Sequence, residues 1–225
     1  MIWAFDIETG PLDFEEIERI APEFEPENVK TGNISDLGKI AEKVEGARVA
    51  HFSSIQKGAA LHAEYSSVLA LGWTSDKTQE VLHASDHTEP QMLSLFWDAA
   101  INAYSDGYIL AGHNIKNFDL PYMVRRSFTH GICVPQVLLP ERSRFWPSFF
   151  FDTMEEWSMG DNQRRIGLNK LAKHLGLEGK SGTGKGFGKL FKEDQDAALA
   201  YLEQDLSVTL KVAEKLALTL GRGLR

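Results

Sequence analysis

Short apolar stretches, bounded by glycine, proline and polar residues, predict five β-strands along the chain. The first stretch is rich in β-branched and aromatic side chains, which favour strands, and Gly10 and Pro11 end it. A turn at residues 75–77 joins the second and third stretches, so we expect these two to pair as antiparallel neighbours. The predicted strands are residues 2–10, 68–73, 79–84, 108–112 and the first part of 149–154.

Apolar residues three and four positions apart predict helices after the third strand and after each later one. The first of these helices opens at Thr88, with a proline in its first turn. Two strands followed by alternating helices and strands indicate an α/β fold, with a mixed sheet flanked by helices. The predicted core face of the helix after Thr88 comprises Met92, Leu95, Phe96 and Ala99. The other helices are predicted at residues 119–129, 168–175 and 194–220.

Residues 11–66 separate the first two predicted strands and are too many for a simple hairpin connection. Within them, a helix capped by Ser35 or Asp36 is predicted to run through Val44. A chain of 225 residues has the length of one domain with an elaboration. We therefore expect a single domain, residues 1–225, that contains 11–66 as an insertion.

Two acidic residues stand within the first predicted strand. Residues i and i+2 of a strand point to the same face, so the carboxylates of Asp6 and Glu8 emerge side by side. Adjacent carboxylates in a buried strand repel each other and resist desolvation, so they need a cation or a proton. The alternative is an exposed edge strand with solvated acids, which the apolar flanks disfavour. A hard divalent ion with oxygen ligands fits the pair if further acids join it.

Two later motifs supply those acids. Asp119 lies in H-N-x-x-x-F-D, and Asp205 ends the pattern Y-x-x-x-D. Together with the D-I-E-T that holds Asp6 and Glu8, they resemble the three motifs of the DEDD class of 3′–5′ exonucleases. The tyrosine of the last motif, Tyr201, resembles the DEDDy subtype, which occurs in the proofreading exonuclease domains of DNA polymerases such as family B. The three motifs occur in order and span most of the chain.

This resemblance implies a ribonuclease H-like fold with a mixed five-stranded sheet, whose central first strand lies beside the last helix. It also implies that the four acids hold two Mg²⁺ or Mn²⁺ ions and that the chain hydrolyses phosphodiester bonds from a 3′ end. Tyr201 would orient the attacking water, because a phenol with a pKa of about 10 is a poor general base at neutral pH. Further candidates for substrate contacts, also by resemblance, are Thr9, Asn114 and Phe118.

The expected substrate is the 3′ end of single-stranded DNA, with RNA as an open alternative. Two other functions compete with this one: a catalytically inactive nucleic-acid-binding module on the same fold, and a different nuclease such as an RNA-directed enzyme or an endonuclease of the ribonuclease H type. The Tyr-x-x-x-Asp pattern favours the exonucleases. A DNA polymerase or a repair protein is a possible partner, and the sequence leaves the oligomeric state open.

The net charge of −8 is unusual for a protein that binds nucleic acid, but the charge is unevenly distributed. Residues 1–100 carry 18 acidic and 7 basic residues, whereas 125–192 carry 12 basic and 6 acidic ones. A glycine-rich loop in this basic stretch nearly matches a P-loop, but Gly186 replaces the metal-binding hydroxyl, so we reject nucleotide hydrolysis. Contact with substrate phosphates and a merely flexible surface loop are about equally expected. The lysines concerned are Lys180, Lys185 and Lys189.

The remaining features exclude several classes of protein. No apolar run is long enough to span a bilayer, so no membrane association is expected. A single cysteine, Cys133, excludes an internal disulfide and a zinc site built on several cysteines, and a reducing cytoplasm is the simplest location. His113 is expected to support the second motif rather than to catalyse. Asp152 is expected to cap a helix, with indirect support of the site as the alternative.

Overall fold

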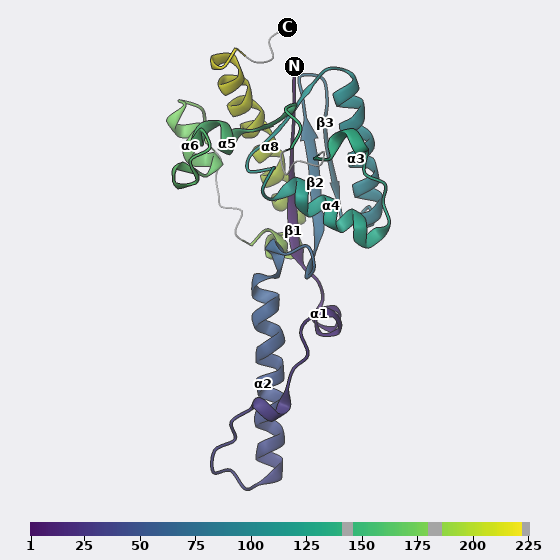
Figure 1. The fold of residues 1–225 in the computed structure, drawn as a ribbon, viewed down its shortest axis with the longest axis vertical. Coiled ribbons are helices and arrows are strands. Elements are labelled where there is room, and N and C mark those ends of the chain that lie inside the picture. The colour runs from purple at the N-terminus through teal and green to yellow at the C-terminus, as the bar shows by residue number, and fades with distance from the viewer. Residues whose placement is uncertain (141–145, 180–185, 222–225) are drawn as a thin grey trace. The chain divides into compact units, whose positions relative to one another are not determined.

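The computed structural model describes residues 1–140, 146–179 and 186–221 of the chain (Figure 1). It divides into two compact units. The main unit comprises Met1–Glu8 and Val68–Arg225, and the smaller unit comprises Thr9–Ser67. The smaller unit thus corresponds to the predicted insertion, within one residue or two at each end.

A five-stranded mixed sheet has the strand order β3-β2-β1-β4-β5. β1 pairs in parallel with β4, β4 pairs in parallel with β5, and β2 and β3 form an antiparallel hairpin. The predicted α/β fold and the central position of the first strand are therefore confirmed. The strands are β1 (Ile2–Pro11), β2 (Ser66–Thr74), β3 (Gln79–His83), β4 (Ile109–Gly112) and β5 (Phe150–Asp152).

Helices follow the strands as the apolar pattern predicts, and the additional ones among the described residues are short. In the main unit they are α3 (Glu89–Ser105), α4 (Asp119–His130), α5 (Thr153–Ser158), α6 (Leu168–His174), α7 (Phe187–Glu193) and α8 (Gln195–Thr219). In the smaller unit they are α1 (Phe14–Ile20) and α2 (Leu37–Gly58). Single 3₁₀ turns occur at Pro26–Asn28, Ala59–Leu61, Gln136–Leu138 and Asn162–Arg164.

The alternation of side chains along β1 assigns its two faces. Trp3 and Phe5 belong to an aromatic cluster with Phe96 of α3, with ring centroids 5.8 and 5.2 Å from that ring. Ile2, on the opposite face, packs in a cluster with Ala213 and Ala217 of α8. Residues i and i+2 of a strand share a face, so Asp6 and Glu8 point to the side on which α8 lies.

The long helix α8 approaches the sheet closely because of a small residue in β2. A Cβ added at Gly72 would lie 2.7 Å from a methyl carbon of Leu206, closer than such atoms can pack. Leu206 is fully buried and lies one residue after Asp205. Gly72 thus permits the close packing of α8 on the sheet that brings Asp205 towards the first strand.

A buried charged cluster connects α3 with α4. One carboxylate oxygen of Glu89 accepts hydrogen bonds from the Val68 N–H and the Arg126 Nε, each at 2.9 Å. The other oxygen accepts from Arg126 Nη2 at 2.6 Å and lies 2.8 Å from His130 Nε2. Desolvation acts to raise the pKa of Glu89, but these hydrogen bonds outweigh it and hold the pKa below its ordinary value.

Two predictions about helices are wrong in detail. The predicted helix through Val44 in fact continues to Gly58, although Asp36 caps it as expected by accepting from the N–H groups of Gly38 and Lys39. Most of α2 is exposed, so helix-forming residues rather than a buried stripe extend it, and its apolar spacing does not mark its end. Leu95, predicted on the core face of α3, is 43% exposed, whereas its neighbours Phe96 and Trp97 are buried.

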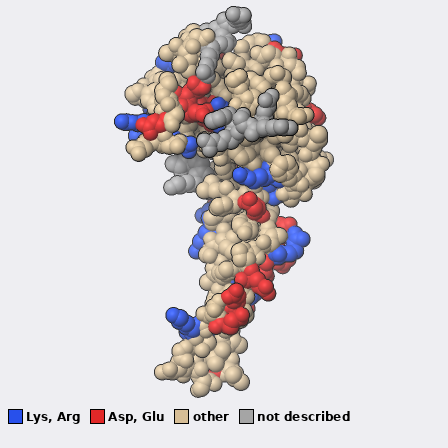
Figure 2. Space-filling view, in the orientation of Figure 1, with Lys and Arg blue, Asp and Glu red and all other residues tan. Residues whose placement is uncertain are grey.

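The surface charge differs between the parts of the chain. Residues 9–67 carry 11 acidic and 6 basic side chains. On the face drawn in Figure 2, acidic side chains line the part that contains α2, with basic ones among them. Within the described residues, none of the helices combines the length and apolarity needed to cross a membrane.

Candidate active site

Three acidic side chains from two elements converge at one end of β1. Asp6 and Glu8 come from this strand, and Asp205 comes from α8. One carboxylate oxygen of each residue lies within 4.8 Å of those of the other two. Asp205 is buried, and the other two are partly exposed, so the group is open to solvent on one side. The predicted approach of the first and third motifs therefore occurs in the structure.

The fourth predicted acid, Asp119, lies at the start of α4 and is 2% exposed. Its Oδ1 accepts a hydrogen bond from the backbone N–H of Ile7, between the two acids of β1, at 3.2 Å. Burial raises the pKa of Asp119 to about 7, and the nearby Asp152 carboxylate contributes to the rise. Asp119 is itself the first residue of α4, and Phe118 occupies the cap position of this helix.

Tyr201 lies one helical turn before Asp205 on α8, so both side chains face the same side of the helix. The phenol is partly buried and hydrogen-bonds the Asp205 carboxylate. Burial raises the pKa of Tyr201 above its ordinary value, and the charges of Asp205 and Glu8 raise it further. The phenol is therefore protonated at neutral pH and can donate a hydrogen bond, but it cannot act as a base there.

The loop between β4 and α4, residues 113–118, carries most of the second motif and is called the motif loop below. Asp152 holds it in place. The buried carboxylate of Asp152 accepts from the N–H groups of Met154 and Glu155, which confirms the predicted cap of α5. It also accepts from the backbone N–H groups of Asn114 (2.9 Å) and Lys116 (3.0 Å). The same carboxylate thus fixes a helix end and the shape of the motif loop.

A further ordering contact of this loop comes from His113. Its Nδ1 lies 2.8 Å from the hydroxyl oxygen of Thr153, and its Nε2 lies 2.9 Å from the carbonyl oxygen of Ile166. The next residue, Asn114, has a positive φ of 70°, a conformation that asparagine tolerates better than most residues. His113 thus joins the motif loop to the segment before α6, as expected of a supporting residue.

A pocket of about 260 Å³ surrounds the acids. Its walls come from β1, the motif loop, the start of α6 and α8. It brings together all three motifs and two of the three residues that the resemblance suggested as substrate contacts. The lining residues are Asp6, Ile7, Glu8, His113, Asn114, Phe118, Asp119, Leu168, Tyr201 and Asp205.

Among the described residues, two other predicted substrate contacts, Thr9 and Lys189, do not line this pocket. Thr9 belongs to the smaller unit, in which its hydroxyl donates to the carbonyl oxygen of Ala60 at 2.6 Å. Lys189 lies exposed on α7, 3.7 Å from Glu193, and is not among the described residues that line the pocket. Lys180 and Lys185 lie outside the described residues.

The donor set of the pocket suits a hard divalent cation. The close ligand atoms are all carboxylate oxygens, which Mg²⁺, Mn²⁺ and Ca²⁺ prefer over nitrogen or sulfur. The partly buried negative charges also need a positive counter-charge or protons. The group thus fits a divalent metal site, and Asp119 stands beside it as a further oxygen donor.

Comparisons with known proteins identify the family and the fold of the chain. Residues 61–221 match a family model described as a predicted 3′–5′ exonuclease related to the exonuclease domain of PolB. A search of curated proteins found no significant match. Among solved structures, the family B DNA polymerase from the hyperthermophilic archaeon Pyrobaculum calidifontis aligns with a TM-score of 0.57 and 17% sequence identity. That alignment covers 96% of this chain and 24% of the polymerase chain, and it shows a shared fold.

The predicted resemblance to this group of exonucleases is thereby confirmed. The chain spans about a quarter of the length of the aligned polymerase. The family match covers well over half of the chain, from residue 61 to residue 221. The chain belongs to the family of predicted 3′–5′ exonucleases related to the exonuclease domain of PolB.

Proposed function

We propose that the chain is a metal-dependent 3′–5′ exonuclease that removes nucleotides from the 3′ end of single-stranded DNA. The observation that carries this proposal is the convergence of Asp6, Glu8 and Asp205 within 4.8 Å, in a pocket that Asp119 and Tyr201 also line. All five belong to the motifs of the DEDDy pattern. A binding module without catalysis would gain nothing from partly buried, mutually repelling acids, which disfavours that alternative.

The residues that line the acidic pocket have different roles in the proposed hydrolysis. Asp6, Glu8, Asp119 and Asp205 would hold two Mg²⁺ or Mn²⁺ ions. Held there, the ions would supply the activation of a water molecule and the neutralisation of charge on the leaving 3′ oxygen. The protonated phenol of Tyr201 positions the attacking water by a hydrogen bond. Asn114 and Phe118 border the pocket and contact the terminal nucleotide, Phe118 by stacking on its base.

We also propose that residues 1–225 act as one exonuclease domain, with residues 11–66 inserted in it, and that Thr9, Lys180, Lys185 and Lys189 contact the strand. The likeness to a polymerase supports a DNA polymerase or a repair protein as partner. The exposed free thiol of Cys133 is consistent with a reducing location such as the cytoplasm.

The decisive experiment uses 5′-labelled DNA and RNA oligonucleotides with Mg²⁺ or Mn²⁺. A ladder of products shortened from the 3′ end is expected with DNA, and the variant Asp6→Asn serves as the inactive control. A ladder with RNA alone would favour the RNA-directed alternative. If the protein binds the DNA and RNA oligonucleotides but cleaves neither, the proposed catalysis is refuted, and the nucleic-acid-binding module remains as the function.

A further inference from the structure

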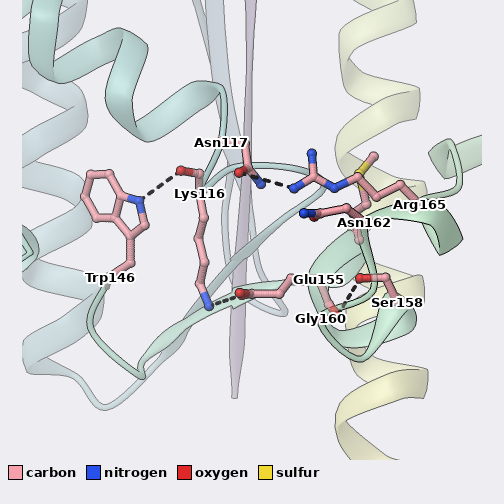
Figure 3. A pocket seen from close by; sticks show the side chains of 9 residues that line it. Lys116, Asn117, Trp146, Glu155, Ser158, Gly160, Asn162 and Arg165 are labelled. Atoms are coloured by element: carbon pink, nitrogen blue, oxygen red, sulfur yellow. Dashed lines mark hydrogen bonds and ion pairs between the residues drawn. The ribbon is translucent and has the colours of Figure 1, made fainter. Parts of the chain in front are cut away.

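A second pocket, of about 230 Å³, is lined in part by the motif loop (Figure 3). The function proposed above makes no use of it. Its walls come from the motif loop, the segment before β5, α5 and the segment before α6. The lining residues are Lys116, Asn117, Trp146, Met154, Glu155, Ser158, Gly160, Asn162 and Arg165.

The pocket carries a positive charge that the described residues leave without an acidic partner. Lys116 is neutralised by Glu155, whose carboxylate lies 2.5 Å from the ammonium nitrogen. Arg165 is exposed. Its guanidinium donates a long hydrogen bond, 3.4 Å, to the neutral side-chain oxygen of Asn117 (Figure 3). Within the described parts of the chain, no salt bridge joins Arg165 to a carboxylate. The amides of Asn117 and Asn162 add neutral donors around it.

The opposite wall of the pocket is rigid. The indole N–H of Trp146 donates to the backbone oxygen of Lys116 at 2.9 Å, and its ring meets Phe150 edge-on with centroids 5.9 Å apart. Figure 3 shows the Trp146 ring and the Lys116 chain on one side and Arg165 with Asn162 on the other. Because its N–H is held by a partly buried hydrogen bond, the rest of the indole forms an apolar wall of the pocket.

The two pockets share the same two segments of chain. The motif loop lines the acidic pocket with Asn114 and Phe118, and the second pocket with Lys116 and Asn117. The segment around α6 lines the acidic pocket with Leu168 and the second pocket with Arg165, three residues earlier. Three residues of extended chain span at most about 11 Å, so the cationic pocket is next to the acidic one.

We propose that this second pocket binds an internucleotide phosphate of the substrate strand, on the 5′ side of the nucleotide that is removed, and that Arg165 makes the charged contact. The inference rests on the proposed exonuclease function, because it places the strand between the two pockets. A guanidinium suits a phosphate because its N–H groups match the phosphate oxygens in pairs. Contacts to phosphate position a strand without reading its sequence, as an exonuclease that shortens any sequence requires.

The test compares Arg165→Ala with Arg164→Ala, which removes the same charge from the neighbouring residue. Arg164 is highly exposed, lies 3.7 Å from Asp161 and does not line the pocket, so it is a matched control. Binding of a short single-stranded oligonucleotide is measured in Ca²⁺, so that affinity is obtained without cleavage. We expect a roughly tenfold loss of affinity for Arg165→Ala, the low end for a charged hydrogen bond, and a much smaller loss for Arg164→Ala.

Two further readouts separate a phosphate contact from a structural role. The slope of log affinity against log salt should flatten by about 0.7 for Arg165→Ala, as expected for one phosphate of a single strand. Arg165→Lys keeps the charge but loses the paired N–H groups, so its affinity should lie between those of the parent and Arg165→Ala.

A scan of neutral methylphosphonates along the oligonucleotide identifies the phosphate. One substitution near the 3′ end should weaken binding to the parent and have no effect on Arg165→Ala, which is the signature of a direct pair. Equal losses of affinity for Arg165→Ala and Arg164→Ala would overturn the inference. So would a scan in which every methylphosphonate weakens binding to Arg165→Ala as much as it weakens binding to the parent. Cleavage is assayed separately: a parent that shows this binding pattern but never degrades the strand refutes the proposed function and leaves the phosphate pocket standing.

Discussion

Replacing Asp205 by asparagine is expected to abolish cleavage and yet to make the metal-free protein more stable. The reason is the close spacing of the acids: the Asp205 carboxylate lies within 4.8 Å of those of Asp6 and Glu8. Without a cation, these charges repel each other in the folded state and are far apart in the unfolded chain. Asparagine keeps the shape of the side chain and removes one of the charges, so part of the repulsion is relieved.

The size of the effect follows from the distance. Two unit charges 4.8 Å apart repel by about 1 kcal/mol in water and by about 3.5 kcal/mol at an effective dielectric constant of 20. Asp205 faces two such charges, but the variant weakens the hydrogen bond with Tyr201, at a cost of about 1 kcal/mol. The free energy of unfolding in EDTA should therefore rise by on the order of 2 kcal/mol, which corresponds to roughly 4–8 °C in Tm.

Added metal should reverse the order of the two proteins. An ion at a hundred times its Kd stabilises the folded state by about 2.7 kcal/mol, and the variant should lose most of this gain. Thermal unfolding with EDTA and with Mn²⁺ measures both effects, at a pH above about 7 so that Asp119 is ionised. Glu203→Gln, an exposed acid on the same helix, is the matched control and should change neither Tm nor cleavage.

Two outcomes would contradict the reasoning. An Asp205→Asn protein that unfolds below the parent in EDTA would show that charge repulsion does not dominate this site. A variant that cleaves at a near-normal rate with saturating Mg²⁺ would refute the assignment of Asp205 as a metal ligand.

Three further predictions concern a catalytic side chain, the buried charged cluster and the glycine-rich loop. Tyr201→Phe should slow the chemical step roughly ten- to a thousandfold with nearly unchanged substrate affinity, and full kcat would reduce Tyr201 to a packing residue. Glu89→Gln should lower the free energy of unfolding by about 3 kcal/mol at neutral pH, because it leaves a buried cation unpaired. Because the folded-state pKa of Glu89 is lowered, its contribution to stability is complete above its unfolded pKa and is lost as the pH falls through the folded pKa, so the parent and Glu89→Gln should converge in acid melts. Replacing Lys180, Lys185 and Lys189 by alanine should weaken binding equally for all sequences and flatten the salt slope by about two units, whereas an unchanged slope would make the loop a mere connector.

The parts of the site that the sequence can predict are those set by local spacing. Asp6 and Glu8 share a face because strand geometry fixes it, and Tyr201 and Asp205 share a face because helix geometry does. Local spacing does not bring the strand pair and the helix pair together, and the resemblance to a known set of motifs supplies that step. The meeting of all three motifs in one pocket can therefore be predicted from the sequence only through this resemblance.

The parts that the sequence cannot predict depend on contacts between distant segments. Asp152 is recognisable as a helix cap because a cap is local, but its bonds to the N–H groups of Asn114 and Lys116 join segments 38 and 36 residues apart. The pocket around Arg165 has the same origin, because no motif marks an arginine that meets Asn117 across 48 residues. The full length of α2 escapes prediction for another reason: an exposed helix is determined by propensity and capping, and these signal its end weakly.

The negative charge of the acidic pocket has two consequences for the chemistry. It creates the need for cations at Asp6, Glu8 and Asp205, and it raises the pKa of the Tyr201 phenol in addition to the effect of burial. A phenol held protonated cannot take a proton from water, so the activation of water cannot come from Tyr201. The tyrosine is thereby limited to hydrogen bonding, as a donor through its O–H and as an acceptor through its oxygen. The acids that raise its pKa are the residues that would hold the ions. Placing Tyr201 one turn from Asp205 on α8 therefore puts its protonation under the influence of the carboxylates that would hold the ions.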